Sequence, residues 1–186
     1  MADDQLSTPH PQQLLEQAEL IHSSEVIAAA ISRLGDEIST TLEHENPIVL
    51  CVVSGGIVFA GQLLTRFAFP LELDYVHASR YQNATIGRTL VWEALPKLDL
   101  TNRTILLVDD ILDEGVTLKA IQDKCFELGA TKVFCAVLVE KLLDHAKPIS
   151  ADFVGLIVPN RYVFGYGMDA YGWWRNLSAI YALKAS

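Results

Sequence analysis

The feature that most constrains the fold is a series of short, almost unbroken apolar runs, such as IVLCVV (48–53), separated by segments with helical spacing. Apolar runs of this length without polar alternation are typical of strands buried on both faces of a parallel sheet. From these runs and two more mixed ones we expect strands at residues 48–53, 71–78, 89–95, 104–110, 132–141 and 152–158. Helical spacing occurs in residues 57–67 and 117–130. The alternation predicts an α/β fold with a mostly parallel sheet and helices on both faces.

The N-terminal quarter of the chain has a different pattern. From Pro11 to about His44, apolar residues recur with helical spacing that is broken once near Ser23, which predicts helices. A chain of 186 residues, 51% of them hydrophobic, has enough apolar surface for one core and too little length for two comfortable domains. We therefore expect a single domain over residues 1–186, with residues 1–45 as a helical segment packed on it.

Composition and charge limit the classes of partner. A formal net charge of -9 opposes non-specific binding to nucleic acid and to anionic membranes. The longest apolar stretches have only strand length and the N-terminus is acidic and polar, so we expect neither a spanning helix nor a secretory signal. The chain has three cysteines, and this odd number fits buried thiols in a reducing compartment better than a disulfide framework. We expect a cytoplasmic protein with no nucleic-acid or membrane partner.

One apolar strand runs directly into a group of carboxylates, in ILLVDDILDEGVT (105–117). Ligands of parallel sheets bind at the carboxyl ends of the strands, where loops and helix N-termini converge. N–H groups at the start of the next helix favour an anion such as phosphate, Gly115 permits close approach of the chain, and the Thr117 hydroxyl adds a donor. Asp109 and Asp110 cannot hold a phosphate, but they can accept hydrogen bonds from sugar hydroxyls or act through Mg²⁺. Phosphate, sugar and metal together suggest an activated ribose phosphate.

The same stretch resembles the phosphoribosyl pyrophosphate (PRPP) signature of the type I phosphoribosyltransferases. Together with it, four segments occur in an order similar to that of the hypoxanthine-guanine phosphoribosyltransferase family: VVSGG (52–56), HASRYQNAT (77–85), LVEK (138–141) and ADFVGLIVPNRYVFGYGMD (151–169). The resemblance implies the type I phosphoribosyltransferase fold with a small hood, Mg²⁺ as cofactor, and a homodimer or homotetramer. It also implies purine salvage, in which phosphoribose passes from PRPP to N9 of hypoxanthine or guanine to give IMP or GMP and pyrophosphate.

The resemblance assigns roles around the signature. The residues that match binding positions for the ribose and the 5′-phosphate of PRPP are Asp109, Asp110, Asp113, Glu114, Gly115, Val116 and Thr117. Asp113 matches the catalytic acid or base near purine N7, although Asp at such a position is also a common helix N-cap. Adenine phosphoribosyltransferases resemble this signature but have Ala at the position of Asp113. The carboxylate therefore favours a 6-oxopurine.

The resemblance also assigns residues to the purine, the pyrophosphate and the metal. The purine-binding positions are Lys141, Tyr162, Val163 and Asp169, the pyrophosphate-binding positions are Ser54, Gly55 and Arg175, and the carboxylates near Mg²⁺ are Asp109, Asp110 and Asp169. The Lys141 ammonium would donate to a 6-oxo group and oppose a 6-amino group, although a Lys at a strand end is more often solvated. Tyr162 would stack on the purine, and burial in the core is the alternative for this ring.

Three positions depart from the usual family pattern. Many members have Lys at the position of Ser54, Ser at that of Arg80, and a hydroxyl residue at that of Glu114. Arg80 and Tyr81 belong to the segment that resembles the mobile lid of the family, which closes over the site and excludes water. The resemblance further implies a cis peptide bond between Val53 and Ser54. Glu114 must point away from the phosphate or weaken its binding.

Two other classes of function remain open. A regulator with this fold would bind PRPP or a nucleotide without turnover, although the chain is acidic and has no spare DNA-binding domain. A doubly wound domain that accepts a phosphate explains Asp109 and Asp110 but leaves Lys141 and RYVFGYGMD (161–169) unexplained. The residues do not rank hypoxanthine against guanine, and they leave xanthine open as a third base.

Overall fold

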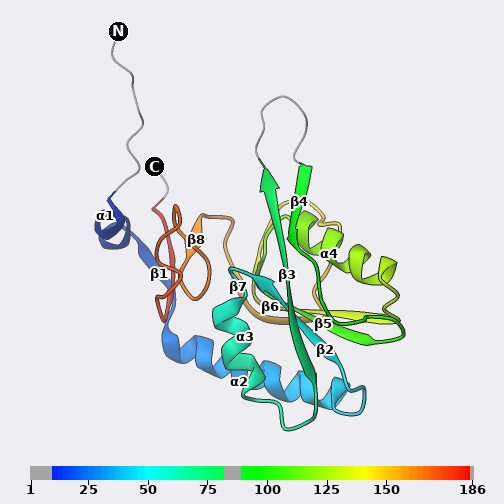
Figure 1. Ribbon diagram of the computed structural model, residues 1–186. Coiled ribbons are helices and arrows are strands. Elements are labelled where there is room, and N and C mark those ends of the chain that lie inside the picture. The colour runs from blue at the N-terminus through cyan, green and yellow to red at the C-terminus, as the bar shows by residue number, and fades with distance from the viewer. Residues whose placement is uncertain (1–9, 82–88, 185–186) are drawn as a thin grey trace.

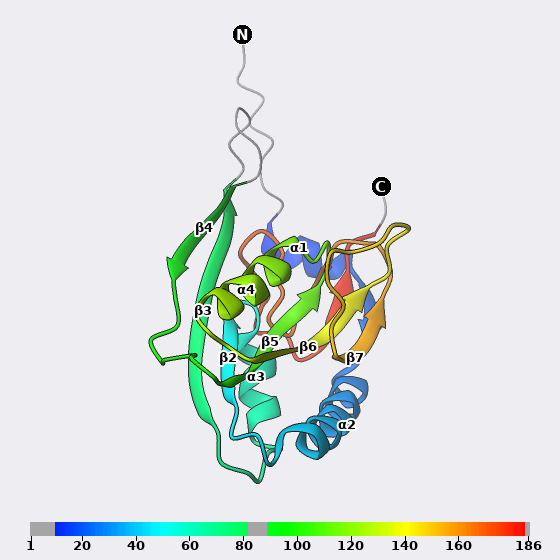
Figure 2. The same ribbon diagram turned by 90° about the vertical axis from the view of Figure 1, so that its right-hand side faces the viewer.

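A six-stranded sheet forms the centre of the computed structural model, which describes residues 10–81 and 89–184 (Figure 1). Its strand order is β4-β3-β2-β5-β6-β7, with β4 and β7 at opposite edges (Figure 2). The strands are β2 (Ile48–Val53), β3 (Glu72–Tyr81), β4 (Thr89–Ala94), β5 (Thr104–Leu112), β6 (Lys132–Lys141) and β7 (Phe153–Val158). Every neighbouring pair is parallel except β3 and β4, which are antiparallel. The predicted α/β fold with a mostly parallel sheet is confirmed.

Helices cover both faces of this sheet, because successive residues of a buried strand point to opposite sides. On β5, Leu106 packs in an apolar cluster with α2 (Ser24–Leu42) and α3 (Ile57–Leu64). The next residue, Leu107, packs in a second cluster with α4 (Val116–Glu127). The sheet thus lies between α4 and the other two helices (Figure 1), as predicted.

Some elements end at other residues than the pattern predicted. Strand β5 continues through Leu112, because this residue is buried in the same cluster as α4. Asp109 and Asp110 therefore lie within the strand and not at its last residue. The helix expected at residues 57–67 ends at Leu64.

The N-terminal segment is only partly helical, so the prediction for residues 1–45 is wrong in one place. The chain does break near Ser23, which is the N-cap of α2, and α1 (Pro11–Glu16) precedes the break. Between the two helices, Glu19–His22 forms strand β1 instead of continuing a helix. β1 pairs with β9 (Ile180–Ala182), near the other end of the chain. This partner satisfies the backbone N–H and C=O groups, and such a long-range pairing overrides local helical spacing.

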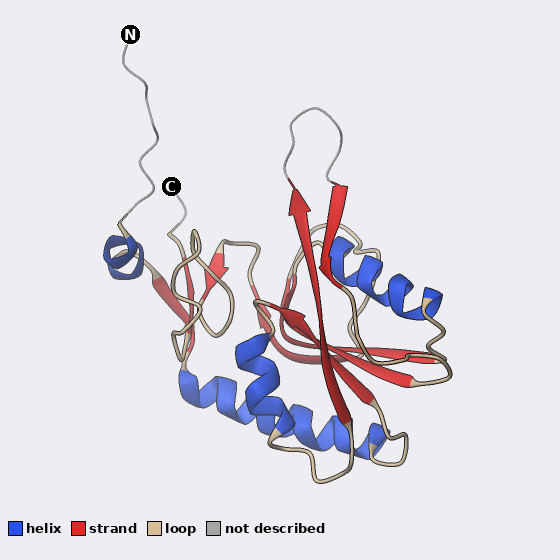
Figure 3. Cartoon of the chain, viewed as in Figure 1, coloured by secondary structure: helices blue, strands red, loops and turns tan. Residues whose placement is uncertain are grey.

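A second sheet forms the hood that the family resemblance implied. It has three antiparallel strands in the order β1-β9-β8, where β8 is Val163–Phe164. Figure 3 shows these strands apart from the large sheet. A small apolar cluster that includes Leu14 and Phe164 packs α1 on the hood. The hood therefore depends on segments from both ends of the chain.

Two further features bear on the predicted setting of the protein. Cys51, Cys125 and Cys135 are all buried and free, as predicted, and burial raises the thiol pKa of Cys51 to about 11 and of the other two to about 12. Over the part of the chain that the structure describes, none of the helices is both long enough and apolar enough to cross a lipid bilayer.

Candidate active site

A cavity of about 380 Å³ lies between the carboxyl ends of the central strands and the hood. Its walls come from the ends of β2, β5 and β6, the start of α4, and the segment between residues 162 and 175. Most of the predicted site residues line it: Gly55, Asp109, Asp110, Asp113, Glu114, Gly115, Thr117, Lys141, Tyr162, Val163, Asp169 and Arg175. The fold therefore brings together in one place the residues that the sequence pattern suggested separately.

The loop between β5 and α4 is a tight turn that directs the N-terminus of α4 toward the cavity. Gly115 is the N-cap, and its left-handed φ of 76° favours glycine. A Cβ atom at this position would also lie only 3.0 Å from Cγ2 of Ile149. The first N–H groups of a helix have no acceptor within the helix and attract anions. Because Gly115 and Thr117 line the cavity, a phosphate can be bound at this point.

Two carboxylates lie beside this loop, where Asp110 is buried and Asp109 is half-buried. Asp110 is 7% exposed, and its N–H donates to Oδ1 of Asp109 at 2.9 Å. Burial raises the pKa of both carboxyl groups, and the proximity of Asp110 raises that of Asp109 further. The positive charge of Arg175 acts in the opposite direction on Asp110. Two crowded carboxylates in a low dielectric are stabilised by a cation or by hydroxyl donors.

These carboxylates fit a hard divalent cation such as Mg²⁺, which the family resemblance implies. Carboxylate oxygens are typical Mg²⁺ ligands, and this ion commonly takes its other ligands from water and from substrate phosphates. Within residues 10–81 and 89–184, no three His, Cys, Asp or Glu side chains form a group that could hold a metal ion. The described residues can thus supply one or two ligands, and a phosphorylated substrate would supply others.

An ion pair between Asp113 and Lys141 joins the loop before α4 to the end of β6. Lys141 Nζ donates to Oδ2 of Asp113 at 2.7 Å, and the Lys141 side chain is only 11% exposed. Lys141 is therefore not a solvated surface residue. Asp113 does not cap α4 either, because Gly115 is the N-cap. The cavity thus has a cationic donor and a carboxylate side by side, which can face the polar edge of a planar heterocycle.

The Glu114 carboxylate, at a position that departs from the family pattern, is held by a histidine. His145 Nε2 lies 3.0 Å from Glu114 Oε2, and its Nδ1 lies 3.0 Å from Asp144 Oδ1. Hydrogen bonds to Asp144 and then to Glu114 raise the pKa of His145, which favours the imidazolium between the two carboxylates. This positive charge partly compensates the negative charge of Glu114 beside the N-terminus of α4.

The hood contributes an aromatic ring to the cavity wall. The rings of Tyr162 and Tyr171 are stacked, with centroids 5.9 Å apart and an interplanar angle of 12°. Tyr162 is 47% exposed and lines the cavity, so it is not a core residue. The adjacent Val163 is buried in β8, where its backbone pairs with Ala182. A half-exposed ring on a fixed strand end is suited to stacking on a flat base.

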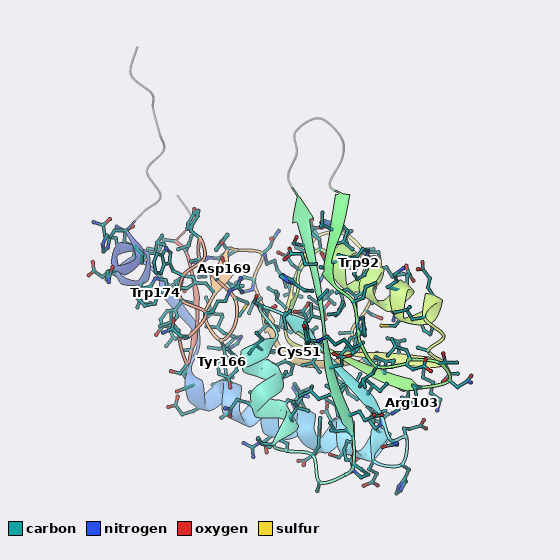
Figure 4. All side chains as sticks on the ribbon, in the orientation of Figure 1. Cys51, Trp92, Arg103, Tyr166, Asp169 and Trp174 are labelled. Atoms are coloured by element: carbon teal, nitrogen blue, oxygen red, sulfur yellow. The ribbon has the colours of Figure 1, made fainter. Side chains whose placement is uncertain are left out.

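Arg175 and Asp169 form an ion pair in the segment that follows β8. Arg175 Nη2 lies 2.6 Å from Asp169 Oδ1, and Arg175 Nη1 donates to the Gly167 carbonyl at 2.6 Å. The N–H of Gly172 donates to Asp169 Oδ2 at 2.7 Å. Asp169 and the neighbouring Trp174 both lie in the hood region (Figure 4). The guanidinium is therefore fixed in direction, and its planar charged fork is suited to a diphosphate.

The loop after β2 approaches the two carboxylates closely. Its Val53–Ser54 peptide bond is cis, as the family resemblance implied. A Cβ atom on Gly55 would lie 2.1 Å from Oδ2 of Asp110, so only glycine fits this position. Gly55 lines the cavity, whereas Ser54 is exposed and does not. A pyrophosphate could contact the backbone of this loop without the Ser54 side chain.

Another predicted residue, Val116, also does not form part of the described walls. Val116 is 53% exposed and does not line the cavity. Arg80 and Tyr81 are the last residues of β3, where their backbones pair with Leu90 and Thr89 of β4. The rest of the segment that resembles the lid, residues 82–88, lies outside the described residues.

Sequence reasoning missed the apolar part of the cavity wall. The additional lining residues are Val52, Val53, Ala78, Ile111, Leu112, Leu118 and Met168. Ile111 and Leu112 are the two apolar residues inside the carboxylate-rich signature, and Val52, Val53 and Met168 lie in two other segments of the resemblance. Membership of these segments was the available signal. Apolar walls exclude water and strengthen the electrostatic interactions of the polar groups.

Comparison with known proteins identifies relatives over most of the chain. The family model described as "Phosphoribosyl transferase domain" matches residues 17–170. A Tritrichomonas foetus protein named hypoxanthine-guanine-xanthine phosphoribosyltransferase is 30% identical over 168 residues, which cover 90% of this chain and 92% of that protein. The Listeria monocytogenes bifunctional protein TilS/HprT is 35% identical over 164 residues. This match covers 87% of the present chain, which spans only a quarter (25%) of the Listeria protein.

A solved structure shows the same fold. It is that of a hypoxanthine-guanine-xanthine phosphoribosyltransferase, with a TM-score of 0.82 and 28% sequence identity. The superposition covers 91% of this chain and 99% of that one. The fold of this chain is therefore similar to that of an enzyme of known structure.

Proposed function

The chain belongs to the phosphoribosyl transferase domain family, and from this premise we propose that it is a purine-salvage enzyme. It transfers phosphoribose from PRPP to N9 of hypoxanthine or guanine, giving IMP or GMP and releasing pyrophosphate. The observation that supports this substrate class is the Asp113–Lys141 pair, which lies in the same cavity as the N-terminus of α4. One cavity thus offers partners for a 6-oxopurine and for a phosphate.

A 6-oxopurine fits the Asp113–Lys141 pair because N7 and the 6-oxo oxygen lie side by side on one edge of the base. In the free protein Lys141 donates to Asp113. On base binding, the Lys141 ammonium turns to the 6-oxo oxygen. The Asp113 carboxylate takes the proton from N7 as N9 bonds to the ribose, and it returns that proton in the reverse reaction. The 6-amino group of adenine would meet a cationic donor instead of an acceptor. Tyr162 stacks on the ring and holds it in the plane of these two groups.

The ribose and its phosphates fit the other wall. The N–H groups at the start of α4 bind the 5′-phosphate, while Asp109 and Asp110 accept hydrogen bonds from the ribose hydroxyls. Arg175 and the Gly55 backbone face the pyrophosphate. The bond from purine N9 to ribose C1 forms as the bond from C1 to the pyrophosphate oxygen breaks, and holding both partners in line removes much of the entropic cost.

Mg²⁺ would be held by Asp109 and Asp110, and Asp169 would act on it through substrate or water. When bound, the ion would neutralise the charge of the diphosphate. Arg80 and Tyr81 belong to the lid in this proposal, which keeps water from the reacting centre. The proposed setting is the cytoplasm, where the three buried cysteines stay reduced. A homodimer or homotetramer is the proposed assembly.

Steady-state nucleotide formation tests the proposal. Hypoxanthine, guanine, xanthine, adenine and uracil are offered separately with PRPP and Mg²⁺, and a parallel series contains a chelator in place of Mg²⁺. We expect turnover with 6-oxopurines only, and loss of that turnover in the chelator series. Turnover of adenine would contradict the role of Lys141. PRPP binding without turnover of any base would contradict the enzyme function and would indicate a PRPP-binding regulator instead.

A further inference from the structure

A lysine with a largely buried side chain, outside the cavity walls, links the two strands that end at the proposed base site. Lys147 belongs to the segment between β6 and β7, and its side chain is 9% exposed. Its ammonium donates to the Lys141 carbonyl at 2.7 Å, to Glu140 Oε1 at 3.0 Å and to the Leu112 carbonyl at 3.2 Å. An ammonium has three N–H donors, so all three have acceptors in this arrangement.

The positions of the two carbonyl acceptors are informative. Leu112 is the last residue of β5 and directly precedes Asp113, while Lys141 is the last residue of β6. The last paired residues of the two strands are Leu112 and Glu140. Beyond this pair β5 and β6 no longer form ladder hydrogen bonds with each other. The Lys147 ammonium therefore spans the gap between the strands where the sheet ladder stops. It contacts both backbones next to the Asp113 and Lys141 side chains.

The rest of this segment also packs under the loop before α4. A Cβ atom on Gly115 would lie 3.0 Å from Cγ2 of Ile149 and 3.5 Å from Cβ of Lys147. His145, two residues before Lys147, contacts Glu114. Three residues of one segment thus lie against the loop before α4, and Lys147 also donates a hydrogen bond to the backbone of β6.

Stability alone gives a weak reason for a lysine at this position. Taking an ammonium and a carboxylate out of water costs much of what their attraction returns, and apolar replacements of buried ion pairs are often neutral or stabilising. An ammonium can, however, bind two carbonyl oxygens and a carboxylate at once, which an apolar side chain cannot do. The arrangement thus favours a role in geometry.

We propose that Lys147 is a positioning residue that holds Asp113 and Lys141 at the spacing required to contact purine N7 and the 6-oxo group. This inference rests on the proposed function. Lys147 does not touch the substrate in this account, and it acts through the Leu112 and Lys141 backbones. A shift of about 1 Å in reacting groups can lower a rate by about a hundredfold, so loss of the link should affect catalysis strongly.

The test compares Lys147→Met with Lys132→Met. Lys132 lies at the other end of β6, where it pairs with Glu45 at 2.8 Å, so this control removes a paired lysine from the same strand away from the cavity. A double variant, Glu140→Gln with Lys147→Met, also removes the carboxylate that the single variant leaves unpaired, so it is less prone to misfold. Lys147→Arg keeps the positive charge and the N–H donors. For each variant we measure kcat, the KM values for hypoxanthine and PRPP, and the thermal unfolding midpoint.

We expect Lys147→Met and the double variant to lower kcat/KM for hypoxanthine by about tenfold to a hundredfold. The KM for PRPP should stay within about threefold of the wild-type value, because the hydrogen bonds within α4 itself hold the first turn of that helix. Lys147→Arg should recover part of the loss, and Lys132→Met should match the wild type. Unchanged kinetic constants in the folded Lys147 variants, with only a lower unfolding midpoint, would overturn the positioning role. Absence of wild-type turnover with every base would overturn the proposed function and this inference with it.

Discussion

The phosphate side and the hood side of the cavity are built in opposite ways. On the phosphate side, β5, the loop and α4 supply their residues from one continuous stretch between Thr104 and Glu127. The hood combines β1, β8 and β9, which come from both ends of the chain. The first half of the site is therefore encoded locally, whereas the second half exists only after distant segments have paired. Substitutions in the two halves should therefore have different consequences. Those in the first half should mainly lower catalytic activity, and those in the second should mainly lower the stability with which the hood packs on the sheet.

The two halves meet at a contact between glycines. A Cβ atom on Gly167, in the hood segment, would lie 2.2 Å from the carbonyl oxygen of Gly55, in the loop after β2. Gly55 in turn packs on the Asp110 carboxylate. The spacing between the hood and the sheet thus depends on the absence of side chains at Gly55 and Gly167.

The largest effect is expected at Asp113, on the phosphate side. Asp113→Asn keeps the shape of the side chain but removes its ability to exchange a proton, so kcat with hypoxanthine should fall by about 10² to 10⁴. The unfolding midpoint should change little, because Asp113 is 45% exposed. Asp123→Asn on the exposed side of α4, where Asp123 pairs with Lys119, is the control and should keep wild-type turnover. A kcat of Asp113→Asn within threefold of wild type would rule out the acid or base role.

A smaller loss of activity, with a clear loss of stability, is expected at the junction with the hood. Gly167→Ala places a methyl group against the Gly55 carbonyl at a φ of +106°, so the free energy of unfolding should fall by about 2 to 4 kcal/mol. Gly172→Ala is the matched control, since Gly172 has a φ of +87° but nothing within 4 Å of the added atom. It should lose only about 1 kcal/mol for its backbone conformation. Equal losses in denaturant unfolding would show that the junction is not tightly packed.

A gain in stability is expected from Asp109→Asn. Burial and the proximity of Asp110 raise the pKa of Asp109 in the folded protein. For an acid with a raised folded pKa, ionisation opposes folding above that pKa, and the cost disappears below the unfolded value of about 4. The variant should therefore have a higher unfolding midpoint near pH 7, by on the order of a few degrees, and this gain should vanish as the pH falls to about 4. Its turnover should be lower than that of the wild type.

Asp74 provides a control for this reasoning, because its pKa is shifted in the opposite direction from that of Asp109. Burial would raise the pKa of Asp74, but N–H groups of Leu98, Tyr75 and Lys97 hydrogen-bond to its carboxylate, and the net pKa is lowered. Its contribution to stability is present above the unfolded pKa and is lost as the pH falls through the folded value. Asp74→Asn should therefore lower the unfolding midpoint at pH 7. If both variants shifted the midpoint in the same direction, the electrostatic account of Asp109 would be wrong.

The smallest effect is expected where the N-terminal helix joins the hood. Trp174 Nε1 donates to the Pro11 carbonyl at 2.7 Å, so Trp174→Phe should cost about 1 kcal/mol in the free energy of unfolding. Trp173 is 56% exposed, and Trp173→Phe should change stability by less than about 0.5 kcal/mol. A Trp174→Phe variant as stable as the wild type would show that this tie between α1 and the hood adds nothing measurable.

The fold and the phosphate side were largely predictable, because their signals are local. Buried strands have continuous apolar runs, and Gly115 and Thr117 mark a strand-to-helix turn that is suited to phosphate. The strand at Glu19–His22 was not predictable, because its partner β9 is far away in the sequence. The Asp113–Lys141 pair was also beyond local reasoning, since the two residues are 28 positions apart. Their roles remain predictions that the experiments above address.

Local patterns in the sequence were enough to predict the parallel sheet, the helices on both faces and the place of the proposed ribose-phosphate site at the end of β5. These features follow from the spacing of apolar residues and from turn chemistry within a few residues. Three other features became evident only in the folded chain: β1 is a strand, Tyr162 lines the cavity, and Lys147 links the ends of β5 and β6. Each of these depends on contacts between segments that are distant in the chain, and the free energy of such contacts arises only when folding brings the segments together.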